Sequence, residues 1–449
     1  MILDRKSIPG FTPIFFFSMN ELTSKKGSTV MIKNILKYTF IVLNMHSAYA
    51  QLQNHPLMAH SFAQASIAEQ SGNIALASKL YKVVVQQYPT CTQAWYNLAH
   101  TCKDLNLIDD AIYAYQEVLA QDPEHVFARF GLGQCYGSLY EYEKAFPLLE
   151  LRGSAIKEFT RDIEYLKNKY SHHQSLQGLR ILLRAEWGLG DNIQFIRYAQ
   201  LLHDRGAYII MHSYPELQPL FKLCPYIDHV ISAGDGFPIH QLQIPLLSLP
   251  YVCSITQKNC TPFIPYLKAS NELTEQWHTY LKDYHTFNIG ICWQGKGDAQ
   301  APPLLNKNIP LAKLASLSNL PGVSIFSLQK NNSDAHAFQG LIQLDDSFDL
   351  AHGRFMDTAA LMNSLDLIIT IDTSIAHLAG ALHRPVWLLL PYHSDWRWGA
   401  QGETSPFYPS MRLFRQKNPG DWQAVIHEIV TALKEMAQPA VACRAGKPG

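Results

Sequence analysis

The sequence predicts an α/β protein of two successive lobes, preceded by an all-helical module. Between residues 57 and 157, apolar residues recur at helical spacing in units about 34 residues long. From Gly178 onward, short apolar runs typical of buried strands alternate with amphipathic helical stretches. Of the 449 residues, 47% are hydrophobic and 16% are charged, so the chain has enough apolar material for several cores.

The helical units share large and small apolar residues at fixed offsets. Pro89 and Pro123 lie 34 residues apart, and each closes a helical pattern because proline cannot continue the hydrogen-bond ladder of a helix. Such units are typical of the tetratricopeptide repeat. We expect this module over residues 57–172, with a groove that holds an acceptor protein or another protein partner. The apolar positions are Ala65, Ala68, Ala77 and Tyr81 in the first unit, Trp95, Leu98, Ala99, Cys102, Ala111, Tyr115 and Val118 in the second, and Leu132, Gly133, Tyr136 and Ala145 in the third.

Two α/β lobes are expected after this module, over residues 178–270 and 271–436. Where two doubly wound lobes follow each other, the carboxyl ends of their strands line a cleft, which is the expected ligand site. The predicted strands cover 179–186, 207–212, 229–232 and 243–250 in the first lobe, and 287–295, 324–330, 366–372 and 384–391 in the second. The predicted helices cover 191–205, 311–318, 357–365, 374–382 and 421–436.

Both ends of the chain are expected to lie outside these domains. Residues 1–56 indicate a leader or disordered segment, and within it residues 31–50 resemble a weak secretory signal. Its apolar run from Tyr38 to Met45 is too short to span a bilayer. We favour an unstructured leader, because short apolar stretches easily mimic targeting segments. The tail over residues 437–449, rich in Ala, Pro and Gly, is expected to be disordered.

Charge and cysteine content narrow the class of protein. The formal net charge is zero, which argues against a nucleic-acid partner, because phosphate-backbone binding needs a clustered basic excess. The eight cysteines form no CxxC pair, and no set of cysteines and histidines has zinc spacing. We therefore expect reduced thiols, no metal site, and a cytoplasmic protein without a stable membrane span.

The first candidate site is the segment Ala185–Phe195, which ends a predicted strand and opens a helix. Gly188 and Gly190 suit a tight turn there, since glycine lets the backbone approach a bound group closely. Asp191 then lies at a helix N-terminus, where it is either a capping carboxylate or a general base that faces the cleft. A helix N-terminus stabilises the ionised carboxylate, so a base at this position needs compensation such as burial on substrate binding.

The second candidate site lies within Leu365–Pro391. A predicted strand delivers Asp372 and Thr373 to a turn, and a helix begins near Ser374. Hydroxyls and backbone amides at a helix N-terminus form an anion cradle, and His377 on the first turn is close enough to help hold a phosphate. The alternative is a capped helix with a histidine satisfied in the core. A nucleoside diphosphate suits such a cradle.

Three further features are candidates of lower specificity. Gln329 and Lys330 end a predicted strand, where the lysine can pair with a phosphate, although exposed lysines are common on any surface. Trp293 either stacks on a bound ring or packs in the core. The segment 391–416 is dense in aromatic residues and is expected to be a long loop whose rings mainly pack it down.

Together these stretches resemble a known family. They are similar to bacterial tetratricopeptide-repeat glycosyltransferases whose catalytic half is similar to the heptosyltransferases, and the layout also resembles that of protein O-GlcNAc transferases. The resemblance extends from about residue 57 to 436. It implies the GT-B fold, two Rossmann-like lobes with a cleft. The stretches are WGLGDNIQFIRYAQLL, IGICWQG, FSLQK, DTAALMNSLDLIITIDTSIAHLAGALHRPVWLLLP and DWRW…SPFYPSMRLFRQ.

The resemblance also implies roles for individual residues. Asp191 matches the catalytic base of heptosyltransferases, and Lys330 falls where relatives place a phosphate-facing lysine. Relatives carry Arg-Ser where this chain has Lys307-Asn308, and glycine where it has His383, after a helix. The donor-phosphate motif D-[ST]-x-x-x-H is matched by Asp372, Thr373, Ser374 and His377.

The resemblance implies an inverting, metal-independent glycosyltransferase without a cofactor. Its donor is a nucleotide-diphosphate sugar, and its acceptor is a hydroxyl group of a protein or a glycan. The alternative is a non-catalytic scaffold, in which the repeats bind a protein and the transferase fold is degenerate.

Overall fold

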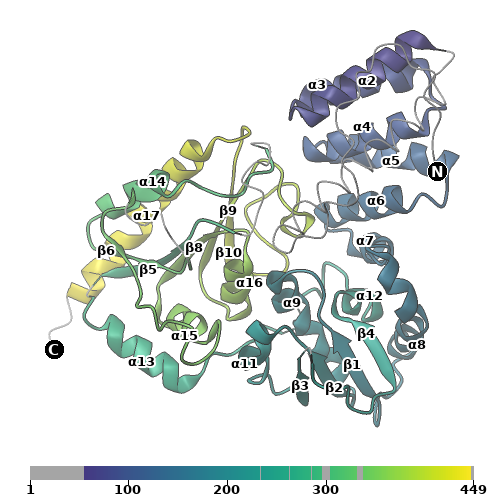
Figure 1. Cartoon of the computed structure of the whole chain (residues 1–449). Coiled ribbons are helices and arrows are strands. Elements are labelled where there is room, and N and C mark those ends of the chain that lie inside the picture. Colours follow the sequence, from purple (N-terminus) through teal and green to yellow (C-terminus); the bar gives the residue numbers. More distant parts are fainter. Residues whose placement is uncertain are drawn as a thin grey trace, which may run out of the picture.

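The computed structural model of the chain (Figure 1) describes residues 55–445, except 233, 262, 285, 296–303 and 331–336. The described residues form a helical array, a four-stranded sheet and a six-stranded sheet. The expected leader lies outside them except for its last two residues, and the signal-like segment 31–50 lies wholly outside. No helix in the described part of the chain is both long and apolar enough to cross a membrane.

Three helical hairpins make up the N-terminal array. Their second helices begin at residues 74, 108 and 142, a regular spacing of 34 residues. Fully buried small residues such as Ala65, Ala77 and Ala111 lie where the helices meet, so the helices can approach closely. The predicted contact positions are buried, apart from the half-buried Tyr136. The hairpins are α2 (Pro56–Gln70) with α3 (Ile74–Gln87), α4 (Thr92–Asp104) with α5 (Ile108–Gln121), and α6 (Val126–Ser138) with α7 (Tyr142–Leu149).

The first sheet is parallel and has the strand order β3-β2-β1-β4. In the register of β1 with β2, Leu182 lies opposite Ile210. Both residues are fully buried, as expected for a parallel sheet covered on its faces. The strands are β1 (Arg180–Arg184), β2 (Tyr208–His212), β3 (His229–Ile231) and β4 (Leu242–Pro245), and the short helices around them are η4 (Pro215–Leu217), α11 (Gln218–Phe221), η5 (Leu246–Ser248) and α12 (Leu249–Val252).

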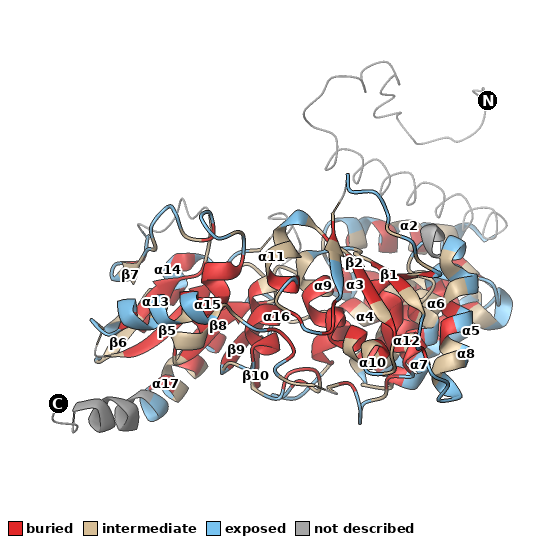
Figure 2. Ribbon diagram, turned by 90° about the horizontal axis from the view of Figure 1, so that it is seen from below, coloured by how far each residue is buried: buried red, intermediate tan, exposed pale blue. Residues whose placement is uncertain are grey.

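The second sheet is also parallel, in the order β10-β9-β8-β5-β6-β7. Strand addition reverses direction between β5 and β8, and such a point leaves a crevice at the carboxyl ends of the strands. Every residue of β5 and β8 is buried, and both strands are red in Figure 2. The strands are β5 (Phe287–Cys292), β6 (Val323–Ser327), β7 (Leu341–Ile342), β8 (Leu367–Ile371), β9 (Val386–Leu390) and β10 (Met411–Arg415), and the helices are α13 (Asn271–Leu281), α14 (Leu311–Leu314), η6 (Ala315–Asn319), α15 (Met356–Ser364), α16 (Ser374–Ala381) and α17 (Trp422–Ala445).

The structure corrects two boundaries of the expected domains. After η2 (Ser154–Phe159), α8 (Thr160–Ser171) packs against α12 and β4 of the first lobe. The helical array therefore ends before the expected residue 172. At the other end, α17 continues to Ala445, so the tail is not disordered from residue 437 onward. Alanine, which recurs in this tail, has the highest intrinsic helix propensity.

Two expected elements differ in their internal structure. The helix expected over 191–205 is divided into α9 (Leu189–Phe195), η3 (Ile196–Tyr198) and α10 (Ala199–His203). The expected long loop 391–416 contains η8 (Trp396–Trp398) and ends in β10. In β10 the buried Met411 and Leu413 flank the exposed Arg412, a strand alternation that the density of aromatic residues before it had concealed.

Candidate functional site at the junction of the two lobes

The N-termini of two helices, one from each lobe, meet at the centre of the molecule. Beyond β1 the chain enters α9, and beyond β8 it enters α16; Figure 1 shows these two helices side by side. A Cβ atom added to Gly190 of α9 would lie 2.7 Å from Cδ2 of His377 and 3.6 Å from Cα of Ser374. The structure therefore brings together the two sites that the sequence predicts separately.

Asp191 lies at this junction, and both of its carboxylate oxygens are engaged. Oδ2 accepts a hydrogen bond of 2.9 Å from the backbone N–H of Gly188, as in a capping interaction. Oδ1 accepts a hydrogen bond from Nη2 of Arg397, which comes from the other lobe. The Asp191 side chain keeps 20% of its surface exposed, so it is a cap that also faces the junction.

Arg397 is a functional candidate that the sequence analysis missed. Its Nη1 donates to Oδ1 of Asp395 over 2.8 Å, and its guanidinium lies over the rings of Trp396 and Phe195. Burial alone would lower the pKa of Arg397, but the carboxylates of Asp395 and Asp191 outweigh it and raise the pKa. The signal was available in the sequence, because Asp395 and Arg397 are charged residues within an aromatic segment that was interpreted as packing.

His377 is buried and held from two sides. Its Nδ1 lies 2.8 Å from the hydroxyl of Tyr408, and its ring stacks on Trp398 with centroids 5.1 Å apart. Burial, together with the positive charge of Arg397, lowers the pKa of His377 well below its ordinary value. The imidazole is therefore neutral at pH 7 and acts as a hydrogen-bonding group rather than as a cation.

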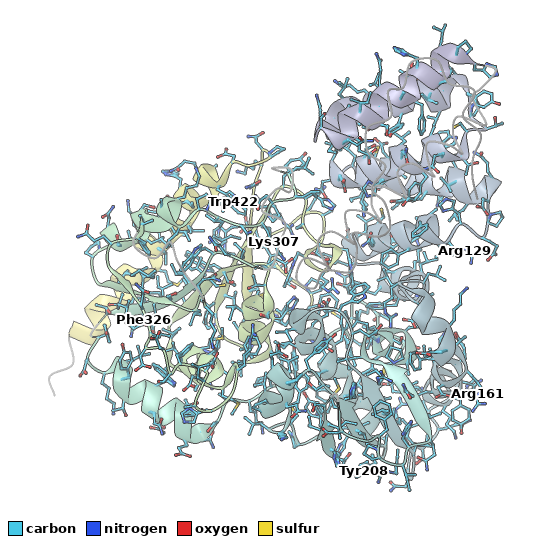
Figure 3. All side chains as sticks on the ribbon, in the orientation of Figure 1. Arg129, Arg161, Tyr208, Lys307, Phe326 and Trp422 are labelled. Atoms are coloured by element: carbon cyan, nitrogen blue, oxygen red, sulfur yellow. The ribbon has the colours of Figure 1, made fainter. Side chains whose placement is uncertain are left out.

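Asp372 lies on the other side of His377 and faces a lysine. Its Oδ1 is 3.9 Å from Nε2 of His377, and its Oδ2 is 4.0 Å from Nζ of Lys307. Burial raises the pKa of Asp372, and the Lys307 charge partly offsets this effect. Figure 3 labels Lys307 in the loops near the middle of the molecule. The sequence analysis noted Lys307 only as a departure from the resembled pattern.

The α16 N-terminus carries two hydroxyl groups, of which that of Ser374 is free for a ligand. Thr373 is the N-cap residue with extended backbone, and its side chain does not cap the helix. Its Oγ1 lies 3.5 Å from Oγ1 of Thr370. The hydroxyl of Ser374 has no hydrogen-bond partner among the described residues. This end of the helix can therefore offer backbone N–H groups and a serine hydroxyl to an anion.

Three other predicted site residues lie apart from this cluster or have structural roles. Trp293 is fully buried in the core of the second lobe, which agrees with the packing alternative and not with stacking on a ligand. Gln329 Oε1 accepts a 3.0 Å hydrogen bond from the backbone N–H of Gln294 and so ties together the ends of β5 and β6. Lys330 donates over 3.2 Å to the carbonyl of Phe348 and lies 3.7 Å from Oδ2 of Asp349.

The last helical hairpin packs against the segment that carries Arg397. A Cβ atom at Gly137 of α6 would lie 2.6 Å from Cε3 of Trp396. The Tyr140 hydroxyl donates to the carbonyl of Trp398 over 3.2 Å. The backbone N–H of Ala400 donates to the carbonyl of Ser138 over 2.9 Å. The hairpin array is therefore in direct contact with the walls of the candidate site.

Cysteine and metal chemistry were also examined in the described residues. No group of three or more histidine, cysteine, aspartate or glutamate side chains there is arranged to hold a metal ion. Free and buried thiols occur at Cys91, Cys102, Cys135, Cys224, Cys253, Cys260 and Cys292.

Comparison with known proteins gives weak similarities. No protein-family model matches the chain. Protein FlbA of Caulobacter vibrioides is 24% identical over 306 residues, which cover 59% of this chain and 48% of FlbA. The chain thus spans about half the length of that curated relative.

Glycosyltransferases are among the solved structures that resemble the chain. A family 9 glycosyl transferase from Veillonella parvula is 12% identical with a TM-score of 0.41, covering 59% of this chain and 98% of that one. The ADP-heptose LPS heptosyltransferase II of E. coli is 14% identical with a TM-score of 0.38, covering 58% and 100%. A mutant O-GlcNAc transferase of Thermobaculum terrenum is 13% identical with a TM-score of 0.27, covering 90% and 88%. Because these scores are low, the function is inferred from the residues of this chain.

Proposed function

We propose that the chain is an inverting, metal-independent glycosyltransferase of GT-B architecture. It moves a sugar from a nucleotide-diphosphate donor to a hydroxyl group of a protein or a glycan. The observation that carries this proposal is the meeting of two helix N-termini, one with Asp191 and the other with Thr373 and Ser374, at the junction of two parallel sheets. Such a junction can hold an acceptor on one side and an anionic leaving group on the other.

The α16 side supplies the groups that a departing diphosphate needs. Its first backbone N–H groups and the Ser374 hydroxyl lie just beyond the carboxyl end of β8, and Lys307 and Arg397 add two positive charges nearby. Fixed donors and charges aimed at a developing negative charge are usually the largest catalytic contribution. Because these groups can stabilise the diphosphate themselves, we propose that the reaction needs no metal ion and no cofactor.

The α9 side supplies the base. Asp191 takes the proton from the acceptor hydroxyl, and the oxygen attacks the anomeric carbon from the face opposite the diphosphate. The new glycosidic bond forms as the bond from the anomeric carbon to the diphosphate oxygen breaks, and the nucleoside diphosphate leaves with that electron pair. One displacement of this kind inverts the configuration at the anomeric carbon.

The helical hairpins extend this proposal to the acceptor. Their regular 34-residue spacing and buried small residues support a tetratricopeptide-repeat module. In the proposed enzyme this module recruits a protein acceptor or another protein partner, as solenoid arrays do through their extended surfaces. We place the enzyme in the cytoplasm, where a nucleotide-sugar donor is accessible.

Calorimetry with UDP, GDP, ADP, CMP and dTDP, with and without EDTA, tests the proposal. We expect one diphosphate to bind with micromolar affinity that EDTA does not change. Lys307→Gln should weaken this binding roughly tenfold to a hundredfold, because a charge-assisted contact contributes about 1.5–3 kcal/mol. Lys313→Gln, on the exposed side of α14, is the matched control and should bind as the unmodified protein does. Failure of all five nucleotides to bind would favour the scaffold alternative.

A further inference from the structure

We infer that Arg397 is shared between the base and the donor: it pairs with Asp191 in this structure, and it moves to the diphosphate when the donor binds. This inference rests on the proposed function and extends it. Arg397 is then an anion-binding residue whose partner in this structure is the carboxylate proposed as the base. Donor binding and release of the base then become a single event.

The arrangement of Asp191 in this structure leaves neither of its oxygens free. Oδ1 accepts from the Arg397 guanidinium, and Oδ2 accepts from the backbone N–H of Gly188. A general base must come within hydrogen-bond reach of the proton that it takes, and both oxygens here already have a donor. An acceptor hydroxyl is therefore not deprotonated until at least one of these interactions is broken. The ion pair is the one that can be exchanged, because the Gly188 N–H belongs to the same helix end.

Arg397 is placed so that its guanidinium can reach an anion at α16. The next residue, Trp398, stacks on His377 in the first turn of α16. Arg397 also bonds to Asp191 of α9, and the neighbouring Gly190 lies against His377 of α16, so the guanidinium is near this helix end. Moreover, its Nε is buried without a hydrogen-bond partner in the described part of the chain. A donor left unpaired is available to an incoming ligand.

A diphosphate is a stronger partner for this guanidinium than a single carboxylate. It carries more negative charge, and arginine binds phosphate groups through two parallel N–H donors. Asp395 keeps its hydrogen bond from Nη1 and so anchors the arginine while Nη2 changes partner. Since the Arg397–Asp191 pair must break, the affinity for the diphosphate is lower than it would be without that pair.

A double-mutant cycle tests this consequence. The affinity of the nucleoside diphosphate selected above is measured by calorimetry for the unmodified protein, Asp191→Asn, Arg397→Gln and the double variant. Asp191→Asn should bind the nucleotide roughly fivefold to thirtyfold more tightly, because this variant no longer has to break the Arg397–Asp191 ion pair. A partly buried ion pair costs more free energy to break than an exposed one. In the Arg397→Gln background the same change should have no effect beyond about twofold. Glu403→Gln, which removes the exposed partner of Arg412, is the control and should change nothing.

Other results would overturn the inference. Weaker or unchanged binding by Asp191→Asn would mean that Arg397 does not leave Asp191 for the ligand. Equal tightening in the Arg397→Gln background would mean simple charge repulsion from Asp191. Failure of every diphosphate to bind the unmodified protein would refute the proposed function itself, and the inference with it. If Arg397→Gln does not fold, as judged by circular dichroism, Arg397→Lys replaces it, and the gain from Asp191→Asn should then fall because lysine makes only a point contact.

Discussion

Gly190→Ala is expected to force apart the two helix ends that form the candidate site. The added Cβ atom would lie 2.7 Å from Cδ2 and 3.4 Å from Nε2 of His377. Ordinary carbon–carbon contacts are about 3.5–4.0 Å, so these atoms must separate by roughly 1 Å. His377 cannot move away easily, because it is stacked on Trp398 and hydrogen-bonded to Tyr408. The strain must therefore move α9 relative to α16.

The magnitude follows from two opposing contributions. Overpacking a well-packed contact costs about 1–3 kcal/mol. Alanine favours a helical position over glycine by about 1 kcal/mol. The net loss of unfolding free energy is thus about 0–2 kcal/mol, whereas the affinity for a nucleoside diphosphate should fall roughly tenfold or more, because the displaced atoms belong to its site. Gly236→Ala is the control, since a Cβ atom there meets nothing within 4 Å.

Urea unfolding and calorimetry measure the two effects. The reasoning is refuted if Gly190→Ala is more stable than the unmodified protein by the full helix-propensity gain and also binds the nucleotide normally. That combination would show that α9 and α16 do not touch in solution. A loss of affinity with little loss of stability is the expected outcome, because the contact joins two lobes rather than the core of either.

The remaining predictions concern the acceptor, pH and the lobe interface. Trp187→Ala should raise the acceptor KM and leave nucleotide affinity unchanged, because this ring is 48% exposed beside the base at a positive φ of 54°. His377→Gln should reduce the loss of stability between pH 7 and pH 5 in urea unfolding. Burial, and to a lesser extent the charge of Arg397, lowers the pKa of His377 in the folded protein below the ordinary 6.5. As the pH decreases from 7 to 5, the unfolded chain therefore binds the proton before the folded protein does, and the free energy of unfolding decreases. Arg197→Met should cost roughly 3 kcal/mol by urea unfolding, because its buried guanidinium donates to the carbonyl of Gln194, to the Tyr266 hydroxyl and, across the lobes, to the carbonyl of Phe407.

The buried strands were predictable because each of them corresponds to a short run of apolar residues in the sequence. The run predicted over 366–372 forms β8 (Leu367–Ile371), and the run over 384–391 forms β9 (Val386–Leu390). Strands covered on both faces need apolar residues at every position, so the signal is strong even in one sequence. Short helices such as α9 and α10 gave a weaker signal, because one continuous amphipathic pattern covers several broken pieces.

The partners within the site were harder to predict. Asp191 and Arg397 are 206 residues apart, and no local pattern links them. Lys330 follows the end of β6, which favoured it as the phosphate-facing lysine, whereas Lys307 lies in the segment between β5 and α14 and matched no pattern. The structure separates them, because Asp349 near the start of α15 faces Lys330 while Asp372 faces Lys307. Which charged residues pair therefore depends on how turns that are distant in the sequence are placed in space.

The contact of α6 with Trp396 also limits how this protein can be divided or recombined. Gly137 has no side chain, and a larger residue would collide with the indole. A different helical array joined to the lobes would also need a residue without a side chain at the position of Gly137, where α6 contacts Trp396. Removing the hairpins would expose the indole and take away the Tyr140 contact to Trp398. The helical hairpins and the two lobes are thus expected to be stable only together, and substitutions on the surface of the outer hairpins are a better probe of their role than truncation.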